Sequence, residues 1–217
     1  MKRSTRILTA ASALMLAPMY AFPIWRINLI APQYPEGIGM YIHIDSIGGI
    51  KEHDLENINQ LNHYIGMRVI DPLAIPELRW MPWILGALLA LGLLTALANS
   101  RKALVAWVAS FAVAATAGLV DFWKWSYDYG HNLDWEHAII KVPGMVYQPP
   151  LIGVKQILNF RASSWPDVGG LAAFLAMALA LAALVVEFRR RGGRIAPERS
   201  RVATPAAPRA RPATIAC

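Results

Sequence analysis

Hydrophobic residues gather in four long runs, and polar residues fill the stretches between them. The runs cover residues 7–25, 80–98, 103–120 and 168–188, and none carries a charge in its middle. A membrane-spanning helix needs roughly 17 to 25 largely apolar residues. The pattern therefore predicts an all-α integral membrane protein with four transmembrane helices.

Two polar stretches, 26–79 and 121–167, are long enough to form sizeable loops. Basic residues outnumber acidic ones in the short N-terminus 1–6, in the turn 99–102 and in the tail 189–217, whereas acidic residues outnumber basic ones in both long stretches. Because positive charge is retained on the cytoplasmic side of a membrane, both termini and the turn are predicted to be cytoplasmic. The two long loops are then predicted to be periplasmic, on the outer face of a bacterial inner membrane.

The first apolar run allows two interpretations. It follows basic residues, as a signal peptide does, and cleavage after Ala21 would fit a small residue at that point. Met19, three residues before such a cut, is poorly suited to the small-residue rule. We favour an uncleaved signal anchor, and both interpretations place the next segment outside the cytoplasm.

Shorter elements are predicted within the loops. Asp54 suits a helix N-cap and Gly66 a helix end, and the apolar residues between them recur at three- and four-residue spacing. The first loop is thus predicted to contain a short helix. The segment 39–47 alternates enough to predict a short strand or extended stretch, and 151–160 is predicted to be a short amphipathic surface helix.

Composition supports the membrane class and limits the possible partners. Hydrophobic residues make up 56% of the chain and charged residues 16%, too few charges for an ordinary soluble domain. The net charge of +7 comes from the tail 189–217, which has eight Arg and one Glu, while the rest is balanced. This tail is predicted to be disordered and to meet anionic lipid headgroups, and no nucleic-acid partner is predicted. The sole cysteine, Cys217, permits no intrachain disulfide.

Histidine and methionine raise the possibility of a copper site. All five histidines fall in the two outer loops, and imidazole with thioether suits copper, above all Cu(I). His63 and Met67 are one helical turn apart and are the first-choice ligands, with His53, His43 and Met40 as further candidates. Gly66 leaves the geometry of the His63 and Met67 pair open, and simple packing is the alternative interpretation.

Two asparagines accompany the candidate ligands on the predicted short helix. Asn59 and Asn62 would orient these ligands or hydrogen-bond a partner. In the alternative interpretation they fix the shape of the loop with His63.

Other chemistry finds little support in the sequence. The chain has no GxSxG elbow, P-loop, HExxH motif or cysteine pair, so no enzyme is predicted. The apolar runs hold no central ionisable residue to mark a transport pathway. A permease is therefore disfavoured.

Three separated motifs, WRINLIAPQYPEGIGMYIH, ENINQLNHYIGM and YQPPLIGVKQILNF, carry a resemblance to a known group. Over residues 23–160 the chain resembles a family of small bacterial membrane proteins encoded among the nitrous oxide reductase maturation genes of denitrifying bacteria. The resemblance implies an accessory role beside a periplasmic multicopper enzyme that reduces nitrous oxide, and beside the membrane machinery that delivers its copper. It assigns no functional residues.

Two functions follow as hypotheses. In the first, the protein assists copper supply to, or assembly of, a periplasmic cuproenzyme, which the resemblance identifies with nitrous oxide reductase. In the second, it is a non-metal docking or structural subunit that binds a transporter or electron-donor complex through aromatic anchors such as Trp135.

Overall fold

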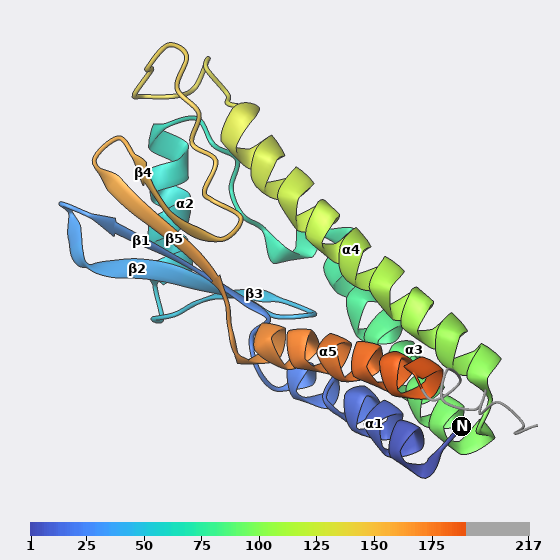
Figure 1. Cartoon of the computed structure of the whole chain (residues 1–217). Helices are drawn as coiled ribbons and strands as arrows, with labels where there is room; N and C mark the ends of the chain where they lie inside the picture. The colour runs from blue at the N-terminus through green and yellow to red at the C-terminus, as the bar shows by residue number, and fades with distance from the viewer. Residues whose placement is uncertain (190–217) are drawn as a thin grey trace, which may run out of the picture.

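The computed structural model describes residues 1–189 as a helix bundle joined to a sheet domain (Figure 1). The tail from residue 190 lies outside the described residues, and with it most of the predicted lipid-binding segment. The helices are α1 (Arg3–Leu14), α2 (Asp54–Tyr64), α3 (Pro76–Ala98), α4 (Arg101–His131) and α5 (Val168–Arg189), with short 3-10 turns at Ala17–Tyr20 and Pro72–Ala74. The strands are β1 (Trp25–Ala31), β2 (Tyr34–Ile42), β3 (Ile47–Gly49), β4 (Gly153–Ile157) and β5 (Phe160–Pro166).

The prediction of an all-α protein is wrong, because the two outer loops form a five-stranded antiparallel sheet in the order β3-β2-β1-β5-β4. The pair of β1 and β5 joins the two loops, with Trp25 opposite Pro166 and Ile30 opposite Arg161. Strand pairing between segments so far apart in sequence depends on backbone hydrogen bonds, which leave little trace in side-chain periodicity.

The surface helix predicted for 151–160 is also wrong. This segment forms β4 and the turn into β5, with Ile157 opposite Phe160. Gly153 and Leu158 adopt positive φ angles of 106° and 53°, which break a helix on both sides of the strand. In the first loop, β2 includes the beginning of the segment 39–47 that alternation predicts to be extended, and β3, which begins at the last residue of that segment, pairs with Met40, Tyr41 and Ile42 of β2.

The short helix of the first loop is present as α2. It begins at Asp54, but the N-cap position is taken by His53, whose side chain makes no capping bond. The Asp54 side chain is buried and turns to the sheet. Gly66, just past the helix, has a φ of +77°, as a helix-ending glycine should.

Three helices of the described chain, α3, α4 and α5, are long and apolar enough to cross a membrane. The fourth predicted span, 7–25, is not one helix, because α1 ends at Leu14 and Trp25 already belongs to β1. α1 nevertheless packs along α3 and α5, and Ser12 Oγ donates to the carbonyl of Ala176 at 2.6 Å.

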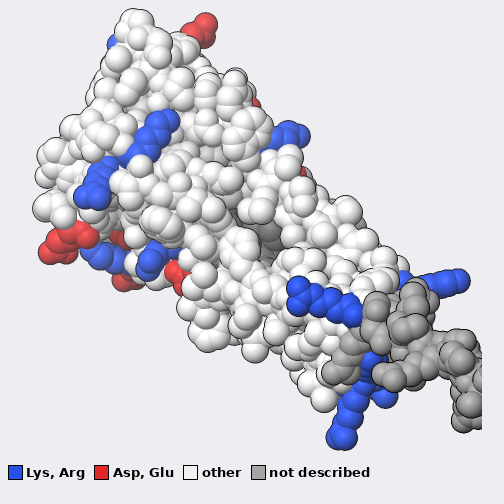
Figure 2. Space-filling model, in the orientation of Figure 1, with Lys and Arg blue, Asp and Glu red and all other residues white. Residues whose placement is uncertain are grey.

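Basic residues gather at the end of the bundle that lies far from the sheet. There Glu187, which is buried, pairs with Arg101 and accepts a hydrogen bond from Thr5 Oγ1 at 2.9 Å. Arg6 Nε donates to the carbonyl of Ala96 at 2.8 Å. On the face seen in Figure 2, an uncharged surface separates this basic end from the charges of the sheet domain.

α4 connects the two parts of the molecule. Its 31 residues span about 46 Å at 1.5 Å per residue, more than the roughly 30 Å hydrocarbon core of a bilayer. The helix therefore continues past the predicted end at residue 120 and reaches the sheet. Phe122, Trp125 and Tyr129 pack against the apolar core of the sheet domain, and the rings of Trp25 and Phe122 lie 5.2 Å apart.

Candidate functional site

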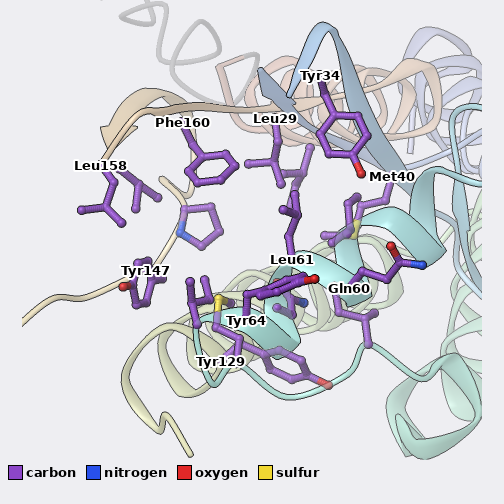
Figure 3. Close-up of a pocket in the computed structure, with 18 of the residues that line it drawn as sticks. Leu29, Tyr34, Met40, Gln60, Leu61, Tyr64, Tyr129, Tyr147, Leu158 and Phe160 are labelled. Atoms are coloured by element: carbon purple, nitrogen blue, oxygen red, sulfur yellow. The ribbon is translucent and has the colours of Figure 1, made fainter. Parts of the chain in front are cut away.

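A cavity of about 540 Å³ lies between the sheet, α2 and the last turns of α4 (Figure 3). The sheet contributes Ile27 and Met40, α2 contributes Leu61, and α4 contributes Trp125. The loop after α4 closes part of the wall with Tyr147. The cavity is thus built from both outer loops together.

The start of α2 is fixed to the sheet by a buried carboxylate. Asp54 is 3% exposed, and its Oδ2 accepts hydrogen bonds from the backbone N–H groups of Gly39 at 3.0 Å and Lys51 at 3.1 Å. A carboxylate held by two N–H groups is a strong anchor. It sets the position of α2 over β2, and with it one wall of the cavity.

The two asparagines of α2 bind the chain that follows the helix. Asn59 donates to the carbonyl of Ile70 at 3.2 Å and accepts from its N–H at 2.8 Å. Asn62, which is buried, donates to the carbonyl of Arg68 at 3.4 Å. Both side chains therefore hold the return segment 68–70 in place.

The loop after α4 is attached to the end of α2 by backbone hydrogen bonds. The N–H of Asp134 donates to the carbonyl of Gly66 at 2.7 Å, and the N–H of Ile140 donates to that of Tyr64 at 2.8 Å. A Cβ at Gly66 would lie 2.6 Å from the carbonyl oxygen of Asp134, so this approach requires glycine. The two outer loops consequently form one structural unit.

The lining is uncharged. Among the residues that line the cavity in the described part of the chain, none is Lys, Arg, Asp, Glu or His. Figure 3 shows Tyr34 of β2 and Gln60 of α2 on opposite walls at one side, and Phe160, Leu158 and Tyr147 at the other. The cavity therefore has a side with polar groups and an apolar side.

Two polar atoms near the cavity are buried without a hydrogen-bond partner among residues 1–189, Trp125 Nε1 and Tyr147 Oη. Burial raises the pKa of the Tyr147 hydroxyl above its ordinary value. Both atoms are enclosed by protein and do not themselves face the open space.

Two of the five predicted copper ligands lie in the cavity and the three histidines do not. Met40 is buried and Met67 half-buried, and both line the cavity. His63 is exposed on α2 and does not line it. Residues 1–189 contain no group of three His, Cys, Asp or Glu side chains that could hold a metal ion.

The other two candidate histidines lie elsewhere on the first loop. His53 is exposed, and its Nδ1 stands 3.3 Å from Glu56 Oε2. His43 packs edge-on to the ring of Tyr41, with 6.5 Å between centroids. Each of the two therefore has a local neighbour that accounts for its position.

The histidines of the second loop also have local partners. His131 stacks on Tyr127, with ring centroids 3.7 Å apart. His137 Nδ1 lies 2.8 Å from Asp134 Oδ2, and this hydrogen bond holds the pKa of the Asp134 carboxyl below its ordinary value. Neither histidine lines the cavity.

Sequence reasoning missed the cavity, although one signal was available. Phe122, Trp125 and Tyr129 follow one another at three- and four-residue spacing, which places them on one face of a helix. The same stretch is dense in aromatic residues, a composition that is also typical of a belt at the membrane interface. Comparisons with protein-family models, curated proteins and solved structures found no match for this chain.

Proposed function

We propose that this protein is a membrane-anchored binding protein, whose sheet domain takes up an apolar ligand in the cavity between the sheet, α2 and α4. The cavity itself carries the proposal. Its volume of about 540 Å³ falls within the roughly 300 to 1,000 Å³ of small-molecule sites, and such sites have mainly apolar and aromatic walls with a few polar groups.

The construction of the walls supports binding. Asp54 fixes the start of α2, Asn59 fixes the segment after it, and the backbone bonds from Ile140 to Tyr64 fix the second loop. A cavity whose walls are held in this way is largely formed before a ligand arrives. Preformed sites lose less conformational entropy on binding.

The bundle supports the anchoring part of the proposal. Three described helices can cross a membrane, and basic residues gather at the end of the bundle away from the sheet, whereas the sheet domain carries charges of both signs (Figure 2). By the positive-inside rule that end is cytoplasmic. The sheet domain then stands on the outer face of the bacterial inner membrane.

The roles implied by the family resemblance stay predictions within this proposal. Copper supply to nitrous oxide reductase would draw on Met40 and Met67, the two thioethers that line the cavity. Docking of a membrane complex would draw on the exposed aromatic side chains, such as Trp135.

The proposal is tested with the full chain in lipid nanodiscs and the neutral fluorescent probe N-phenyl-1-naphthylamine, after subtraction of the signal from empty nanodiscs. We expect saturable binding to the wild type. Leu61→Trp places a larger side chain in the cavity and should weaken binding at least tenfold. Leu73→Trp is the matched control, because Leu73 is 95% exposed and does not line the cavity.

A signal no greater than that of empty nanodiscs would overturn the proposal. Equal binding by the wild type and Leu61→Trp would do the same, because the probe would then lie outside the cavity.

A further inference from the structure

We propose that the ligand is an uncharged molecule with a flat apolar body and one hydrogen-bonding group, and that this group lies between Tyr34 and Gln60. The inference rests on the proposed function and adds the class and orientation of the ligand. Three features of the cavity carry it: the absence of charge from its lining, its aromatic walls and the position of Tyr34 and Gln60 on opposite walls of one side.

The lining selects against charged ligands. Burying an ion without a partner costs several kcal/mol or more, and no lining residue in the described chain carries a charge. The neighbouring Arg68 is already paired with Asp128, and its guanidinium lies over the ring of Tyr129, 5.3 Å from the centroid. The charges of Arg68 and Asp128 therefore neutralise each other outside the cavity.

The apolar side of the cavity suits a flat ring system. Phe160 and Tyr64 come from β5 and α2, and Tyr129 from α4, so aromatic side chains stand on three elements around one space. Rings prefer offset or edge-on contact with other rings. Met40 and Met67 add flexible, polarisable thioethers that adapt to an apolar surface.

Several polar side chains of the lining make no side-chain hydrogen bond within residues 1–189: Gln33, Tyr64 and Asn159, and on the polar side Tyr34 and Gln60. Among residues 1–189, neither the Tyr34 hydroxyl nor the Gln60 amide makes a side-chain hydrogen bond within the protein, unlike Asn59 and Asn62 on the same helix as Gln60. Tyr34 and Gln60 lie across the cavity from each other (Figure 3). Phenol and amide both donate and accept hydrogen bonds, so each can bind a carbonyl or hydroxyl group of a ligand on this side.

The test uses three ligands that share a naphthalene ring: 2-acetylnaphthalene, which carries a carbonyl acceptor, 2-ethylnaphthalene, which lacks it, and the anion 2-naphthoate. Each is titrated against bound N-phenyl-1-naphthylamine on the full chain in nanodiscs. We expect 2-acetylnaphthalene to displace the probe at a concentration about five- to tenfold lower than 2-ethylnaphthalene, as one or two neutral hydrogen bonds would give. We expect 2-naphthoate to be the weakest.

The double variant Tyr34→Phe with Gln60→Leu should remove the preference for the ketone and leave 2-ethylnaphthalene unchanged. Tyr41→Phe is the control, because Tyr41 stands on the same strand as Tyr34 but does not line the cavity. Equal displacement by the ketone and the hydrocarbon in the wild type would overturn the inference, as would tightest binding of 2-naphthoate. Saturable probe binding that Leu61→Trp weakens would in either case leave the proposed function standing.

Discussion

The buried carboxylate of Asp54 accepts a hydrogen bond from the backbone N–H of Gly39 at 3.0 Å and so joins α2 to β2. The same oxygen accepts from Lys51 N–H. A residue suited by sequence to capping a helix thus anchors that helix to a sheet.

Asp54→Ala should destabilise the sheet domain. It would leave two backbone N–H groups without their charged acceptor, and hydrogen bonds to charged groups are worth about 1.5–3 kcal/mol. We expect a loss of about 2–3 kcal/mol in the free energy of unfolding, measured by denaturant titration in nanodiscs with Trp fluorescence. Glu52→Ala, at an exposed position of the same loop, should change it little. If the free energy of unfolding of Asp54→Ala equals that of the wild type, this anchor does not stabilise the domain.

The basic end of the bundle depends on the pair between Arg101 and Glu187. Glu187 is 2% exposed, and loss of one partner leaves a buried charge uncompensated, which costs about 3–5 kcal/mol when both groups are fully buried. Because the Arg101 side chain is 46% exposed, we expect Arg101→Leu to cost less, about 1–3 kcal/mol. Thermal unfolding in detergent should show a lower midpoint for this variant than for Lys102→Leu, which removes an exposed neighbouring charge. Equal midpoints would contradict the prediction.

The contact between Asp134 and His137 gives the second loop a pH dependence. The hydrogen bond from His137 lowers the pKa of Asp134 below its ordinary value of 3.8. A carboxyl with a depressed pKa stabilises the folded form above its ordinary pKa, and this contribution disappears as the pH falls through the lower, folded-state value. We therefore expect the loop to loosen below about pH 4 in the wild type.

His137→Ala should loosen the loop already at pH 4.5 and weaken its pH dependence, because Asp134 then loses the side-chain hydrogen bond that lowers its pKa. Limited proteolysis with pepsin between pH 2.5 and 4.5 measures how readily the second loop is cleaved. His53→Ala is the control at an exposed site of the first loop. The same cleavage profile for His137→Ala and wild type would show that the contact does not stabilise the loop.

Copper loading separates the metal hypothesis from the binding function. If the protein supplies copper, incubation with Cu(I) under reducing conditions and removal of the excess should leave stoichiometric copper on the detergent-purified chain. The His63→Ala, Met67→Ala double variant should then retain little. Met40→Leu tests the second thioether of the cavity, and His137→Ala is the control from the second loop. Absence of copper from the wild type would exclude a site of this kind.

The hydrophobic pattern located the helices whose apolar side chains face a continuous apolar surface, either lipid or the core of the sheet domain. Three of the four apolar runs correspond to α3, α4 and α5, because lipid demands a continuous apolar surface. α2 could also be predicted, since Leu55, Ile58 and Leu61 place one apolar face on the sheet. The run at 7–25 misled, because Pro18 and Pro23 break it and its last residue enters a strand.

The sequence by itself determined that the protein is apolar enough for a membrane, where its long helices lie and that a short helix occupies the first loop. Only the tertiary structure decided the sheet and the cavity. β1 and β5 pair through backbone groups that every residue carries, so the sequence of neither segment indicates which distant strand it pairs with. The cavity exists because that pairing brings Tyr34 and Gln60 of the first loop together with Tyr147 and Phe160 of the second.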